Sequence, residues 1–215
     1  LPDRKIASIV VLTSIAVLNE FYKKDFNMDA MLDRVIREFF PNTNVPSWKK
    51  WVFRVAFGSK AFSRLTDDEQ LVNKNGVPWV SSIIEFFKVR CETELSDFNN
   101  IPRNGATVII SNHPTVLDGL ALIHTVSRVR KDIKIVANHI LPMIFPKVSE
   151  LTIGIKNMAG KMSHKKFREM NDHLRNGGVL IICPAGKLAN WSLSGLQEHK
   201  WNPGFLQLAM RNNAA

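Results

Sequence analysis

The chain contains little cysteine, and its histidines are scattered. Two cysteines occur in 215 residues, Cys91 and Cys183, and their separation fits neither a disulfide framework nor a metal-binding pattern. This usage is typical of a reducing compartment. Cys183 is interpreted as a small core residue, because nothing near it in the sequence would activate a thiol. Five further histidines lack metal-ligand spacing, so we expect no metal and no bound cofactor: His124, His139, His164, His173 and His199.

Long apolar runs and acidic residues are also scarce. No stretch reaches the roughly 18–20 apolar residues that span a bilayer, and the longest candidate, residues 6–18, predicts a buried helix. There are 29 Lys and Arg residues against 19 Asp and Glu residues, which gives a net charge of +10. This balance favours acidic partners, namely anionic lipid surfaces, phosphorylated substrates, an acidic carrier protein or nucleic acid.

The chain divides into a helical region and a region of alternating strands and helices. Residues 28–40 place apolar side chains on one helical stripe, and residues 46–57 begin at a Pro-Ser pair typical of a helix start. Residues 1–88 therefore predict an N-terminal helical bundle. Residues 89–215 predict an α/β domain with a central mixed or mostly parallel sheet flanked by helices. Its first strand is expected at residues 89–93, and one of its helices at residues 118–129.

Aromatic and basic residues alternate in one N-terminal segment. Trp48 and Trp51 flank Lys49 and Lys50. Aromatic residues at helical spacing pack in a core, but the same mixture suits a lipid headgroup interface or a single-stranded nucleic acid. Because no recognised nucleic-acid motif accompanies the segment, we expect core packing or membrane contact and no nucleic-acid partner.

The most informative stretch is residues 108–119. Val108 to Ile110 predict a buried strand, and Pro114 fits the first position of a helix, with His113 near its cap. Helix side chains lean toward the N-terminus, so Asp118 is expected to point at the His113 imidazole. A carboxylate on one ring nitrogen fixes the tautomer and leaves the other nitrogen free to accept a proton. The spacing thus predicts a catalytic dyad.

Two further strand ends add candidate residues. Residues 179–183 predict another buried strand, followed by Pro184, Ala185, Gly186 and Lys187. A Pro-Ala-Gly turn allows close approach of the backbone to a ligand, and its amides are candidates for stabilising an oxyanion. Residues 133–138 and 151–155 predict two more strands, and the second ends at Lys156.

These blocks resemble the glycerolipid acyltransferases of the glycerol-phosphate and lysophosphatidate type. Asn112-His113-Pro114 with Asp118 is similar to the family's H-x4-D block, and Cys183-Pro184-Ala185-Gly186 resembles a variant of its third block. Lys187 stands where that variant has an acid. Trp201-Asn-Pro-Gly-Phe205 resembles the downstream Trp-x-x-Gly-Phe, which opens a helix. The resemblance covers residues 99–210. It implies further C-terminal strands, so we expect the chain to be truncated at its C-terminal end.

The resemblance implies an acyltransferase that moves a fatty acyl group from acyl-CoA or an acyl carrier protein to a lysolipid-like hydroxyl or amine. His113 would be the general base and Asp118 its orienting partner. Gly186 and Ala185 would serve the oxyanion or the donor, and Lys156 and Lys187 an acidic head group, with Lys161 and Arg168 as rivals. We expect peripheral attachment to an anionic membrane from the cytoplasmic side.

Two alternatives remain at this stage. A catalytically silent lipid-binding protein that keeps the fold would tolerate Lys187 in place of an acid. The condensation enzymes of peptide assembly lines pair two histidines with Asp-Gly, and Asp118-Gly119 fits that pattern. However, residue 112 is Asn, the spacing from His113 is one residue too long and the chain is too short.

Overall fold

A computed structural model describes residues 10–12, 71, 73–115, 117–156, 163–192 and 195–215 of the chain. Its centre is a four-stranded sheet in the order β3 (Thr107–Ile110), β6 (Val179–Ile182), β4 (Ile133–Asn138) and β5 (Thr152–Ile155). All neighbouring strands of this sheet are parallel. The expected α/β fold is confirmed, and the sheet is parallel rather than mixed.

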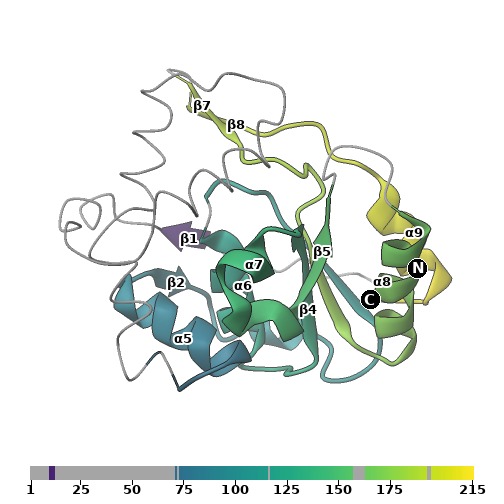
Figure 1. Ribbon diagram of the computed structural model, residues 1–215, viewed down its shortest axis with the longest axis horizontal. Helices are drawn as coiled ribbons and strands as arrows, with labels where there is room; N and C mark the ends of the chain where they lie inside the picture. The colour runs from purple at the N-terminus through teal and green to yellow at the C-terminus, as the bar shows by residue number, and fades with distance from the viewer. Residues whose placement is uncertain (1–9, 13–70, 72, 116, 157–162, 193–194) are drawn as a thin grey trace.

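Helices cover both faces of this sheet (Figure 1). On one face lie α5 (Gly76–Phe86), α6 (Asp118–Val126) and α7 (Leu141–Ile144), with the 3-10 helix η3 (Pro146–Leu151). On the other face lie α8 (His164–Arg175) and α9 (Gly204–Arg211). Parallel strands need such crossover helices, and burial on both faces explains why these strands read as continuous apolar runs.

Each face of the sheet has its own core. Side chains alternate along a strand, so Val179 and Ile181 of β6 join the core beneath α5 and α6, whereas Leu180 joins the core beneath α8 and α9. In α5, apolar residues three and four positions apart make one buried stripe: Trp79, Val80, Ile83 and Ile84. This helix therefore shares its core with the sheet.

A buried arginine ties the amino ends of three strands together. Arg130 is 5% exposed and donates five hydrogen bonds of 2.6 to 3.2 Å, to the carboxylate of Asp132 and to the carbonyl oxygens of Pro102, Gly105 and Gly177. These bonds satisfy every guanidinium N–H. The hydrogen bonds from Arg130 hold the pKa of Asp132 below its ordinary value. Arg130 and its partners lie at the end of the sheet opposite the strand ends that carry the candidate site.

Two expectations about short segments need correction. Within residues 6–18, Val10–Leu12 forms a strand, β1, and not a helix; the rest of that stretch lies outside the described residues. β1 pairs antiparallel with β2 (Arg90–Glu92), so the strand expected at residues 89–93 exists but lies outside the central sheet. Exposed polar residues at both ends of β2 suit this two-stranded arrangement better than a buried parallel sheet.

The helix after the histidine turn begins later than expected. Pro114 lies in the connection, and α6 begins at Asp118. The connection wraps around the Asp118 carboxylate, so side-chain hydrogen bonds replace helical ones over this stretch. At its other end α6 stops at Val126 rather than Val129, because Arg128 and Val129 donate to carbonyl oxygens only three residues earlier.

The remaining elements are short. The 3-10 helix η2 (Asp97–Asn100) precedes β3, and the hairpin of β7 (Asn190–Ser192) and β8 (Gly195–Gln197) follows β6. The N-terminal helices expected within residues 28–57, with Trp48 and Trp51, lie outside the described residues. None of the helices in the described part of the chain has the length and apolar character required to cross a membrane.

Candidate active site

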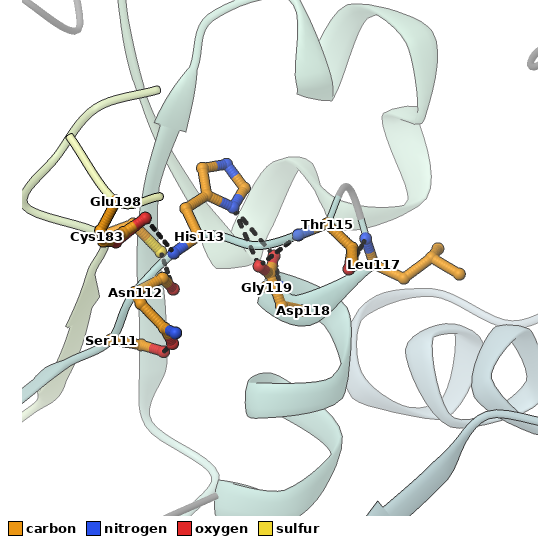
Figure 2. A network of polar contacts seen from close by, with 9 residues as sticks. All are labelled: Ser111, Asn112, His113, Thr115, Leu117, Asp118, Gly119, Cys183 and Glu198. Atoms are coloured by element: carbon orange, nitrogen blue, oxygen red, sulfur yellow. Dashed lines mark hydrogen bonds and ion pairs between the residues drawn. The ribbon is translucent and has the colours of Figure 1, made fainter. Parts of the chain in front are cut away.

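The carboxyl ends of the parallel strands meet at one edge of the sheet, and His113 and Asp118 lie there. The chain leaves β3 at Ile110, turns through His113 and enters α6 at Asp118. Nδ1 of His113 is 3.0 Å from Oδ1 and 3.1 Å from Oδ2 of Asp118. Figure 2 shows the imidazole above the carboxylate, with its other nitrogen directed away from Asp118. The contact expected from the spacing of the two residues is present.

The surroundings of Asp118 determine which tautomer His113 adopts. Asp118 is 2% exposed, and its oxygens accept hydrogen bonds from the N–H groups of Thr115, at 3.1 Å, and Gly119, at 2.8 Å. A carboxylate that already accepts these bonds is an acceptor toward the ring as well, so Nδ1 carries the hydrogen and donates it. In a neutral imidazole Nε2 then has its lone pair free.

Nε2 is accessible from outside the fold. The His113 side chain is 25% exposed, whereas that of Asp118 is 3% exposed. Within the described part of the chain, Nε2 of His113 has no hydrogen-bond partner. The pair thus combines a buried, fixed carboxylate with a ring nitrogen that an incoming hydroxyl or amine can reach, which is the arrangement that general-base catalysis requires.

The second strand end lies beside the first, because β6 is the neighbour of β3. Cys183 donates its S–H to the carbonyl oxygen of Asn112, with Sγ 3.7 Å from that oxygen. Gly186 has φ of +63°, a conformation that favours glycine, and its N–H donates to the carbonyl oxygen of Cys183. The amide of Gly186 is therefore engaged in the turn itself, whereas the amide of Ala185 makes no hydrogen bond among the described residues.

Comparison with protein families shows the family to which the chain belongs. The family model described as "Acyltransferase" matches residues 92–214, a range that contains the four-stranded sheet, His113, Asp118 and the turn at Gly186. The chain belongs to the glycerolipid acyltransferase family. No curated protein and no solved structure gives a significant match to it.

Residues on both sides of the β7–β8 hairpin of this acyltransferase contact the main chain of His113. Before β7, the N–H of Ala189 donates to the carbonyl oxygen of His113 at 2.8 Å. After β8, Oε1 of Glu198 lies 3.5 Å from the His113 nitrogen, and Oε2 lies 3.4 Å from Nε1 of Trp201. Figure 2 shows Glu198 beside the His113 amide.

Reasoning from the sequence missed Glu198. It carries no motif of its own, and the contact joins residues 85 positions apart. The nearest signal in the sequence was the resemblance of residues 201–205 to a family block, which predicted the start of a helix but assigned no partner to the Trp201 indole. Glu198 and Trp201 now join the residues whose contacts fix the position of the His113 turn.

The two lysines proposed for an acidic head group are not equally placed. Lys187 directly follows Gly186 in the turn after β6, the strand next to β3, and its side chain is exposed. Lys156 follows β5, which is separated from β3 by β6 and β4. At a strand spacing of about 4.8 Å this offset is roughly 14 Å, so the structure does not bring Lys156 to His113. Of the two rivals, Arg168 lies on α8, and Lys161 lies outside the described residues.

No group of three or more metal-ligating side chains gathers among the described residues. His164 and His173 both lie on α8, His124 lies on α6, and His139 and His199 lie outside the helices and strands. The chemistry considered below uses the side chains and backbone of the site alone.

Cys183 lies next to the dyad, and its thiol offers a test of covalent chemistry. Burial, together with the smaller effect of the charges of Asp118 and Glu198, raises its pKa to about 12. Because only the thiolate is nucleophilic, we expect iodoacetamide at pH 8 to leave Cys183 of the folded protein unlabelled. We also expect Cys183→Ser, whose hydroxyl can still donate to Asn112, to keep acyl transfer within about threefold of the wild type.

Mass spectrometry of tryptic peptides measures the labelling, with Cys91 as an internal comparison and a denatured sample as the positive control. Rapid labelling of Cys183, together with loss of transfer in Cys183→Ser, would favour an acyl-cysteine intermediate instead of direct attack.

Proposed function

We propose that this acyltransferase moves a fatty acyl group from an acyl thioester to a hydroxyl or amine of a lysophospholipid-like acceptor, with His113 as the general base. The observation that carries this proposal is the contact between Nδ1 of His113 and the buried Asp118 carboxylate, with Nε2 accessible. The membership of the chain in the acyltransferase family supports the reaction class. The donor is acyl-CoA or an acyl carrier protein.

The proposed reaction proceeds in two steps. First, Nε2 of His113 takes the acceptor's proton as the acceptor oxygen or nitrogen attacks the thioester carbonyl carbon, which forms a tetrahedral oxyanion. Asp118 stabilises the imidazolium through Nδ1. Next, the oxyanion collapses, the carbon–sulfur bond breaks, and the imidazolium returns its proton to the leaving sulfur. The products are the acylated acceptor and the free thiol, and His113 is neutral again.

The turn after β6 is proposed to serve the oxyanion. The amide of Ala185 is the candidate donor, because the amide of Gly186 already binds Cys183. Gly186 adopts a positive φ, which sets the direction of the turn. Lys187 is proposed to contact an acidic head group or a donor phosphate close to His113, and Lys156 a more distant anionic group.

A catalytically silent lipid-binding protein remains the second candidate, and Lys187 is the observation that favours it, since a basic residue stands where the family variant has an acid. One assay separates the two. The purified protein is incubated with radiolabelled acyl-CoA or acyl carrier protein and a panel of lysolipids, and products are resolved by thin-layer chromatography. Acyl transfer above a no-protein control supports the enzyme; lipid binding without transfer from either donor supports the silent protein.

We further propose that the protein attaches reversibly to anionic membranes from the cytoplasmic side. The net charge of +10 and the cluster of Trp48, Trp51, Lys49 and Lys50 support this proposal. Each basic residue near an anionic surface contributes about 1 kcal/mol, and salt screens the attraction over about 8–10 Å. We therefore expect flotation with anionic liposomes at low salt and release at high salt.

Neutral liposomes serve as the control for that flotation. Equal binding to neutral and anionic liposomes would indicate apolar insertion rather than electrostatic attachment. Absence of binding to both would contradict membrane attachment and would assign Trp48 and Trp51 to a core.

A further inference from the structure

A concave surface lies at the other end of α6 from Asp118. It is an open hollow of about 660 Å³ between the first turns of α5 and the end of α6, lined by Val77, Pro78, Ser81, His124, Ser127, Arg128 and Lys131. Three of these seven residues are basic and none is acidic. We call this surface the basic hollow.

The side chains of the basic hollow are held in place by contacts with one another and with Phe98. Nδ1 of His124 lies 3.0 Å from Oγ of Ser81, which joins α6 to α5. The hydroxyl of Ser127 donates to the carbonyl oxygen of His124 at 2.7 Å. The guanidinium of Arg128 lies 5.0 Å above the ring of Phe98. The three contacts fix the positions from which nitrogen donors reach the hollow.

Arg128 and Lys131 of the basic hollow are not paired with carboxylates, although the charge of Glu85 on α5 acts on His124. Within the described part of the chain, neither Arg128 nor Lys131 forms an ion pair. Asp132, next to Lys131, is instead bound by Arg130. The first turn of α5 contains no acidic residue, and the amino end of a helix carries a partial positive charge of its own. The charges of Arg128 and Lys131 and the partial charge at the amino end of α5 are all positive.

We propose that the basic hollow binds the phosphate group of a phosphorylated ligand. Arg128 and Lys131 supply charge-assisted hydrogen bonds, as guanidinium and ammonium groups do for phosphate oxygens. The other ring nitrogen of His124 and the Ser81 hydroxyl supply shorter-range donors. This site is separate from His113, because α6 begins beside the dyad at Asp118 and reaches the hollow only at its last turn.

His124 provides a spectroscopic readout. Burial lowers its pKa, the charge of Arg128 lowers it further, and Glu85 of α5 acts in the opposite direction. A bound phosphate stabilises the imidazolium, so the pKa of His124 rises on binding. NMR of the imidazole resonances follows this titration in the whole protein, with inorganic phosphate or pyrophosphate as the probe and sodium chloride at matched ionic strength.

Variants test whether the hollow itself binds the probe. We expect Arg128→Gln/Lys131→Gln to weaken pyrophosphate binding at least about tenfold, since one hydrogen bond to a charged group corresponds to about that factor. If the double variant misfolds, the single variant Lys131→Gln, which retains the Arg128–Phe98 contact, takes its place. We expect this single variant to show a smaller loss of pyrophosphate binding. Arg103→Gln/Lys165→Gln removes the same charge from exposed positions elsewhere and should change binding less than about twofold.

The outcomes separate the sources of the phosphate and the two sites. If soluble phosphates or phosphatidate vesicles lose affinity in the Arg128/Lys131 variants alone, the hollow binds a phosphate from that source. The proposal would be overturned if the Arg103/Lys165 control lost as much affinity as the Arg128/Lys131 variants. It would also be overturned if no probe changed the titration of the His124 resonances. His113→Ala should bind pyrophosphate like the wild type, so failure of the base mechanism and failure of this site are distinguishable.

Discussion

His113→Ala is expected to lower the rate of acyl transfer by about 10²–10⁴-fold, the range over which a positioned general base contributes. The loss should fall on kcat, because the imidazole acts on the proton that moves in the transition state rather than on substrate binding. Single-turnover transfer from a radiolabelled thioester measures it, with KM for donor and acceptor determined separately.

His164→Ala is the matched control, because His164 is an exposed residue at the start of α8, and it should retain wild-type transfer. Thermal unfolding of both variants establishes that the fold is kept. A His113→Ala enzyme that transfers acyl groups at the normal rate would remove His113 from the mechanism, while leaving the assignment of the fold untouched.

The sheet was predictable because burial on both faces gives a signal that the sequence displays directly. The expected strands at residues 133–138 and 179–183 match β4 and β6 to within one residue. Alternation with helices then indicated parallel strands, whose carboxyl ends share an edge. The proximity of His113 to the turn at Gly186 follows from that topology once β3 and β6 are neighbours.

The strand order was not predictable from such local signals. It places Lys187 in the turn after β6, the neighbour of β3, and Lys156 after β5, three strands from β3, although both lysines follow the end of a strand in the sequence. A sequence shows that a residue ends a strand but not which strand lies next to it. The two lysines were therefore indistinguishable before the sheet was described.

The start of α6 shows how a functional residue can override local preference. Pro114 favours the first position of a helix, yet the helix begins at Asp118. The Asp118 carboxylate collects the Thr115 N–H, the Gly119 N–H and the His113 ring. These contacts require an irregular connection, and helix propensity alone does not predict them.

Asp118→Asn is expected to reduce transfer nearly as far as His113→Ala, by about 10²–10³-fold, even though it changes one atom. The asparagine amide has one acceptor oxygen and one donor nitrogen, whereas the carboxylate accepts three bonds from Thr115, Gly119 and His113. Whichever way the amide turns, its NH₂ group faces a neighbouring donor. Where it faces the ring, Nδ1 must become the acceptor, the hydrogen moves to Nε2, and the base is lost.

The control for this change is Asp172→Asn, at an exposed carboxylate on α8, which should leave transfer unchanged. The imidazole ¹⁵N shifts of His113 distinguish a tautomer effect from misfolding, because they report which ring nitrogen carries the hydrogen. We expect the wild type to show the Nδ1–H form and Asp118→Asn to populate the Nε2–H form. An Asp118→Asn protein with the wild-type tautomer and wild-type kcat would show that Asp118 supports the turn and not the chemistry.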